Sequence, residues 1–71
     1  MKVDKQEALR IAHDDASTQY RDLSIYDVII ELDDGNWKID YDLKDKNSQG
    51  GGPQYLISSE TGAILKKTYY Q

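Results

Sequence analysis

The sequence predicts an α+β fold in which one N-terminal amphipathic helix packs on a four-stranded antiparallel sheet, in the order α-β-β-β-β. Three observations predict it: apolar side chains at helical spacing in the N-terminal part, strict apolar/polar alternation in the middle, and two short turns that contain glycine. With 71 residues, the chain is near the size of a single small domain, so we assign residues 1–71 to one domain.

The helix is predicted to begin after Asp4, which can act as N-cap, with Glu7 three residues later completing a capping-box spacing. The pattern ends between Thr18 and Arg21. One face of this helix is rich in alanine, which allows close approach to a sheet. Its predicted members are Ala8, Leu9, Ile11, Ala12 and Ala16.

The first hairpin is predicted from about Leu23 to Leu32 and from Trp37 to Leu43, because Asp34 and Gly35 between them tolerate the positive φ of a tight turn. A turn at this position fixes the register, since side chains alternate between the two faces. The pairs on one face are then Leu32 with Trp37, Ile30 with Ile39, Val28 with Tyr41 and Tyr26 with Leu43. On the other face Glu31 lies opposite Lys38.

A polar, glycine-rich connection from Lys44 to Pro53 is predicted to be a flexible link or a bulged corner, with Gly50–Gly52 as a backbone hinge. The second hairpin then pairs Gln54–Ser58 with Ala63–Tyr69 around a turn at residues 59–62. Two facings are open: either Tyr55, Ile57 and Ile64 are buried, or Leu56 and Leu65 are. We favour the first set because it includes an aromatic residue. Tyr69 and Tyr70 either close the core or extend a binding surface.

Charge and composition limit the function classes. The chain has 13 acidic and 9 basic side chains and no cysteine, so disulfides and thiolate chemistry are excluded. Residues 1–34 carry nine acids against four bases, whereas residues 35–71 carry four acids against five bases. This balance disfavours nucleic acid and suits a basic protein partner, although an acidic excess also serves solubility. With no apolar segment near ~20 residues, we expect no membrane insertion. We expect a cytoplasmic protein, or an exported one if a signal peptide has been removed.

No catalytic or metal-binding motif stands out. His13 cannot face Asp14 or Asp15 on a helix, so we interpret it as a solvated histidine. Asp40, Asp42 and Asp45 resemble a calcium loop only in part, because Lys44 occupies the third ligand position. The glycine run lacks the lysine and the following helix of a phosphate loop. We therefore expect no enzyme, no cofactor and no metal.

One constellation points to binding. The predicted register places Asp27 opposite Asp42, and Ile29 opposite Asp40, on the outer face of the hairpin, with Ile25 further along. Like charges directly opposite each other are destabilising, so the fold gains nothing from them. A protein-binding patch with an apolar centre explains the arrangement. Alternatively, another element or subunit covers the isoleucines, or they simply favour a strand. The candidate partner-binding residues are Ile25, Asp27, Ile29, Asp40 and Asp42.

The chain also resembles known families. The segment Lys5–Ala12, the Asp-Gly hairpin, Tyr55–Ile57 and Glu60–Leu65 together resemble a PepSY-type domain over nearly the whole chain, which implies the cystatin/PepSY-like layout of one helix on an antiparallel sheet. The last third, from Gly50 through Tyr55 and Thr61-Gly62 to Tyr69, is similar to small bacterial immunity proteins with a nuclear-transport-factor-like fold, which neutralise toxins.

These resemblances give two expected functions. The first is a non-enzymatic, acidic bacterial immunity protein that neutralises a cognate toxin by occluding it. The alternative is a PepSY-type inhibitor or modulator of a peptidase at the cell envelope. A sheet this small has an exposed edge strand, so we also leave open a homodimer formed through that edge.

Overall fold

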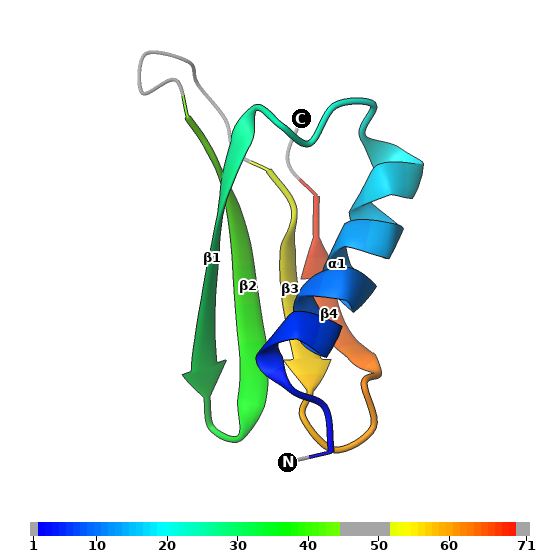
Figure 1. The fold of residues 1–71 in the computed structure, drawn as a ribbon, viewed down its shortest axis with the longest axis vertical. Coiled ribbons are helices and arrows are strands. Elements are labelled where there is room, and N and C mark those ends of the chain that lie inside the picture. The colour runs from blue at the N-terminus through cyan, green and yellow to red at the C-terminus, as the bar shows by residue number, and fades with distance from the viewer. Residues whose placement is uncertain (1, 45–51, 70–71) are drawn as a thin grey trace.

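The computed structural model describes residues 2–44 and 52–69, which form one helix and one four-stranded antiparallel sheet (Figure 1). The strands lie side by side in the order β1-β2-β3-β4. The predicted α-β-β-β-β arrangement is therefore confirmed. The elements are α1 (Lys5–Gln19), β1 (Tyr26–Asp33), β2 (Asn36–Leu43), β3 (Gln54–Ser58) and β4 (Ile64–Thr68).

α1 begins where the capping residue predicts. The Asp4 carboxylate accepts a hydrogen bond of 2.8 Å from the Glu7 N–H. Ala8, Ala12 and Ala16 are completely buried, so the helix backbone lies close to the sheet. Figure 1 shows α1 in front of β3 and β4, with β1 at the edge of the sheet far from the helix. Among the described residues, no helix has the length and apolar character needed to cross a bilayer.

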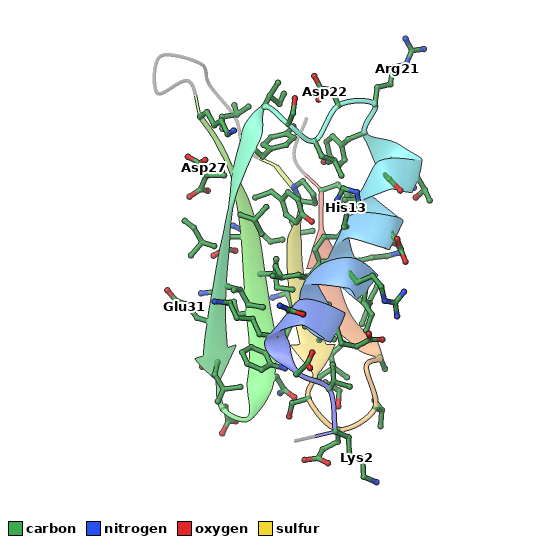
Figure 2. The ribbon with its side chains drawn as sticks, in the orientation of Figure 1. Lys2, His13, Arg21, Asp22, Asp27 and Glu31 are labelled. Carbon is green, nitrogen blue, oxygen red and sulfur yellow. The ribbon has the colours of Figure 1, made fainter. Side chains whose placement is uncertain are left out.

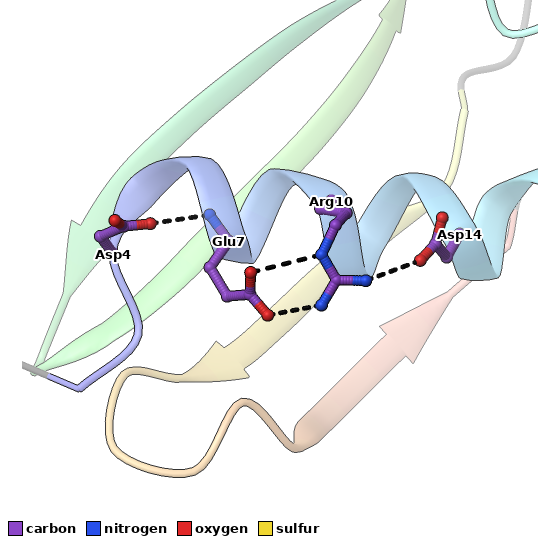
Figure 3. Close-up of polar contacts among 4 residues, drawn as sticks. All are labelled: Asp4, Glu7, Arg10 and Asp14. Atoms are coloured by element: carbon purple, nitrogen blue, oxygen red, sulfur yellow. Dashed lines mark hydrogen bonds and ion pairs between the residues drawn. The ribbon is translucent and has the colours of Figure 1, made fainter.

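Only one of the two capping-box bonds forms. The Glu7 carboxylate binds Arg10 instead of returning to Asp4, with 2.5 Å between Oε1 and Nη2 (Figure 3). Arg10 Nη1 also donates to Asp14 Oδ2 at 3.0 Å. The hydrogen bond from Arg10 lowers the pKa of Glu7. All three side chains are exposed, so solvent screens both ion pairs and each adds little to the stability of the helix.

The β1–β2 hairpin has the predicted register, including Tyr26 opposite Leu43. Asp34 and Gly35 both have positive φ, at 51° and 77°, as a two-residue turn of this twist requires. The start of the strand differs from the prediction, because β1 begins at Tyr26 and not at Leu23. The Asp22 carboxylate accepts from the Ser24 N–H at 2.9 Å, and this local turn holds the preceding residues out of the sheet.

The core lies between α1 and the inner faces of β2 and β3. Ile39, Tyr41, Tyr55 and Ile57 are almost fully buried there, together with the three helix alanines. The facing of the second hairpin is therefore the favoured one of the two predicted, since Leu65 is 54% exposed. β4 is shorter than predicted at each end, and a register irregularity lies opposite Leu56 and Ile57.

The predicted glycine-rich connection falls mostly on residues 45–51, which lie outside the described residues, as does the proposed hinge at Gly50 and Gly51. The last two residues of this connection, Gly52 and Pro53, lie within the described part of the chain and form a bulge opposite Tyr41. The Gly52 N–H donates to Tyr41 O at 2.9 Å, and the Tyr41 N–H donates to Pro53 O at 3.1 Å, so two residues oppose one. A Cβ at Gly52 would lie 2.7 Å from both Tyr41 Cβ and Tyr41 O. The close approach of these two strands requires glycine.

Replacing Gly52 with alanine should therefore destabilise the fold by about 1–3 kcal/mol, because the added carbon must displace Tyr41 or the bulge. Urea unfolding followed by Trp37 fluorescence measures the loss. Gly35→Asn is the control, since asparagine tolerates positive φ and a Cβ at Gly35 meets nothing within 4 Å. Equal stability of Gly52→Ala and the wild type would contradict this account of the bulge.

Candidate functional site

The sheet face opposite α1 carries all of the predicted partner-binding residues, and we call it the open face. Side chains alternate between the two faces of a strand, and Ile39 and Tyr41 point into the core. Their neighbours on β2, and the β1 residues paired with them, therefore point away from the helix. Along β1 and β2 the open face consists of Asp27, Ile29, Glu31, Asp33, Asn36, Lys38, Asp40 and Asp42.

The structure brings the predicted residues together as the register required. Asp27 lies opposite Asp42 and Ile29 lies opposite Asp40. Ile25 precedes β1 and extends the pairing, since its carbonyl accepts from the Lys44 N–H at 2.9 Å. Ile25 and Ile29 are 46% and 43% exposed, so no described part of the chain covers them. This exposure rules out one alternative to a binding patch, namely that another described element of the chain covers the two isoleucines.

The charges on the open face are unevenly paired. Glu31 lies opposite Lys38, whereas Asp27 and Asp42 lie opposite each other and form no ion pair with any described residue. Figure 2 shows Asp27 and Glu31 projecting outward from β1 on the side far from the helix. Within residues 2–44 and 52–69, the acidic side chains do not gather into a group of three that could hold a metal ion. The aspartates therefore form an extended acidic surface.

The centre of the open face is hollowed. A depression of about 320 Å³ lies there, lined by Lys38, Asp40, Gln54, Lys66 and four further residues, among them Tyr55 of the core. Asp40 is half-buried beside it, between Ile29 on β1 and Gln54 on β3. Its Oδ1 atom is buried and has no hydrogen-bond partner among the described residues. A buried acceptor in this state costs free energy that a donor supplied from outside would recover.

A second polar cluster lies on the helix side and was not predicted. Asp15 Oδ2 accepts hydrogen bonds from the Tyr55 hydroxyl at 2.9 Å and from the Tyr69 hydroxyl, and Lys67 Nζ lies 3.5 Å from Oδ1. Both tyrosines belong to a closed ring of five tyrosines with neighbouring centroids 6.0–6.4 Å apart, in which four contacts are edge-to-face and one is tilted. The ring consists of Tyr20, Tyr26, Tyr41, Tyr55 and Tyr69.

This cluster joins the helix to the sheet. Burial acts to raise the pKa of Asp15, but the hydrogen bonds from Tyr69 and Tyr55 and the charge of Lys67 together hold it below the usual value. Burial, followed by the hydrogen bond to Asp15, raises the pKa of the Tyr55 hydroxyl. Both oxygens of the Asp15 carboxylate have partners, and Asp15 does not line the described hollow. We therefore interpret the cluster as structural.

Four sequence candidates remain, of which Tyr69 belongs to this cluster. His13 is exposed on α1, as expected of a solvated helix histidine. Tyr69 packs against the core, which favours the core-closing alternative for that residue, whereas Tyr70 lies outside the described residues. Asp45 of the partial calcium-loop pattern is also outside them. The four-residue spacing of Ile11 and Asp15 was the one sequence signal that Asp15 lies beside the buried helix face.

Replacing Asp15 with alanine should lower the free energy of unfolding by about 1–3 kcal/mol at pH 7, because two tyrosine hydroxyls and Lys67 lose their acceptor. The pKa of Asp15 is depressed in the folded state, so its stabilisation is present above the unfolded value of 3.8 and is lost as the pH falls through the folded value. Urea unfolding at pH 7 and at pH 2.5 measures the effect. The difference in free energy of unfolding between Asp15→Ala and the wild type should be smaller at pH 2.5. Asp14→Asn, which affects only an exposed pair, should change little at either pH. The same difference in free energy of unfolding at both pH values would contradict the proposed link between Asp15 ionisation and stability.

Comparison with known proteins supplies no further assignment. No protein-family model, no curated protein and no solved structure gives a significant match to this chain. The chemistry of the open face therefore has to support any proposal about function.

Proposed function

We propose that this chain is a non-enzymatic protein-binding domain that binds a basic protein partner on the open face of its sheet. The single observation that carries the proposal is the combination of two exposed isoleucines, Ile25 and Ile29, with the directly opposed aspartates Asp27 and Asp42. The opposed aspartates are destabilising, and the isoleucines leave apolar surface in water. Both features become favourable when a partner covers the apolar centre and supplies positive charge.

The hollow beside Asp40 supports the same proposal. Asp40 lines the depression, so a partner side chain that enters it has room there and, once the carboxylate rotates, a hydrogen-bond acceptor. Lys38 and Lys66, which also line the hollow, would repel a second basic group, so they favour one orientation of the partner. The acidic residues that remain accessible would also accelerate the encounter with a basic protein.

Within this class, we propose an immunity protein that neutralises a cognate bacterial toxin in the cytoplasm. The support is the resemblance of the last third of the chain to such proteins, together with a surface suited to steric occlusion. A PepSY-type modulator of a peptidase at the cell envelope is the second candidate, favoured by the one-helix, four-strand layout that this resemblance implies. Protection of growth when the chain is co-expressed with a toxin encoded beside its gene supports the first candidate. Inhibition of a purified peptidase supports the second.

The double substitution Asp27→Asn and Asp42→Asn tests the binding surface. Removing two opposed like charges should raise the free energy of unfolding by about 0.2–1 kcal/mol, while the affinity for the partner falls. The partner is first captured on the immobilised wild-type chain and identified, and its binding is then measured by calorimetry with each variant.

The matched control is Asp34→Asn with Glu60→Gln, which changes the net charge equally but lies in the two exposed turns. Turn residue Asp34 has positive φ, which asparagine tolerates. The control should bind the partner with unchanged affinity. If the open-face variant gains stability and still binds like the wild type, the proposal is wrong.

A further inference from the structure

We infer that β1 receives an extended segment of the partner as a fifth strand, and that this segment alternates basic and apolar residues. The inference rests on the proposed binding function and specifies how the partner is bound. It depends on three features of β1: an unpaired backbone edge, exposed apolar side chains on both of its faces, and charged side chains of one sign.

The backbone edge of β1 is unpaired. β1 is the first strand of the sheet, so one of its sides has no neighbour within the described structure. The pair Ile25 and Lys44 is hydrogen-bonded, and in an antiparallel ladder such pairs recur at every second residue. Asp27, Ile29 and Glu31 therefore bond to β2. The residues between them, Val28 and Ile30, direct their N–H and C=O groups away from the sheet, as does Leu32.

Of the devices that usually block strand pairing, this edge has only its acidic side chains. β1 is eight residues long and contains no proline, lysine or arginine, and its register with β2 shows no bulge. Its core-side residues are incompletely covered because α1 lies over the other strands (Figure 1). Val28 and Leu32 are 43% and 49% exposed. With Ile25 and Ile29, the exposed large apolar residues of this edge lie on both faces, where an added strand would bury them.

The charges select the occupant. Asp27, Glu31 and Asp33 are the charged side chains of β1, and all are acidic. If β1 paired antiparallel with β1 of a second copy, a two-fold axis at Ile29 would place Asp27 opposite Glu31. An axis at Ile30 would place Asp27 opposite Asp33. These two axes give the longest overlap of the two β1 strands, and both oppose like charges, which is destabilising. A strand with basic residues facing Asp27 and Glu31 would instead make the cross-strand electrostatic interaction attractive.

The side-chain pattern of the incoming strand follows from the same register. On the open face, its basic residues would lie beside Asp27 and Glu31, four positions apart. On the helix side, apolar residues would lie beside Val28, Ile30 and Leu32 and complete the cover that α1 does not provide. Backbone hydrogen bonds supply affinity in this mode of recognition, and the alternating side chains supply specificity.

The probe is a capped synthetic peptide, matched in length to β1, that alternates lysine and valine, and its control replaces each lysine with glutamate. Binding to the complete chain is followed by amide chemical shifts. We expect the lysine peptide to bind, with the largest shifts at Val28, Ile30 and Leu32, and the glutamate peptide not to bind. Shifts centred on β4 or on α1, or equal binding of both peptides, would overturn the inference.

Two variants separate the backbone from the charge. Val28→Pro removes one outward N–H without affecting the bonds between β1 and β2, and should weaken binding of the lysine peptide roughly three- to tenfold. Val28→Thr, which keeps the N–H and the branched shape, is its control. Asp27→Asn with Glu31→Gln should remove the preference for lysine over glutamate, and this variant leaves the backbone unchanged if the proline variant fails to fold. Unchanged affinity in a folded Val28→Pro protein would overturn the inference.

The natural partner distinguishes this inference from the proposed function. If Asp27→Asn with Asp42→Asn abolishes partner binding while folded Val28→Pro binds normally, the open face is the binding site but strand addition is wrong. If neither variant affects the partner, the proposed function itself fails. Sedimentation of the chain alone supplies a further outcome: a wild-type dimer that Val28→Pro converts to a monomer would show that a second copy is the occupant, and would overturn the inference.

Discussion

The structure depends on one geometric constraint, which is that a single helix must shield a four-stranded sheet. A helix with side chains is about 10 Å across, whereas neighbouring strands lie about 4.8 Å apart, so one helix covers roughly two strands well. The buried alanines of α1 draw it close to the sheet, and the core forms around Ile39 and Ile57. Most of β1 and much of the opposite face are left in water. The exposed apolar residues of this small protein follow from that limit.

The two sides of the sheet consequently have different chemistry. On the helix side, polar groups are paired: the Asp15 carboxylate joins α1 to Tyr55 on β3 and to Tyr69 beyond β4, and these two rings contact each other edge to face. On the open face, polar groups are opposed or unpartnered, as at Asp27, Asp42 and Asp40 Oδ1. Buried polar groups are normally satisfied in a folded protein. The contrast within one small sheet is the physical basis for placing function on the open face.

Local patterns in the sequence predicted the hairpins because their signals are short-range. The Asp34-Gly35 turn and the alternation from Trp37 to Leu43 together permit one register, and the structure has it. The Asp15 cluster was not predicted, because it joins residues 40 and 54 positions apart that no periodicity connects. The exposure of Val28 and Leu32 was not predicted either. Alternation assigns them to the core side, but only the position of the helix decides whether that side is covered. The candidate binding residues could be located because opposed aspartates follow directly from the register.

Amide hydrogen exchange in the free chain tests most directly whether one helix leaves β1 uncovered. The account predicts an alternating pattern along this strand. Amides of Asp27, Ile29 and Glu31, which bond to β2, should be protected, whereas those of Val28, Ile30 and Leu32 should exchange as fast as amides in exposed loops. The pattern should not depend on protein concentration. Uniform protection of all six amides would mean that something covers the edge in the free protein, and would contradict the account.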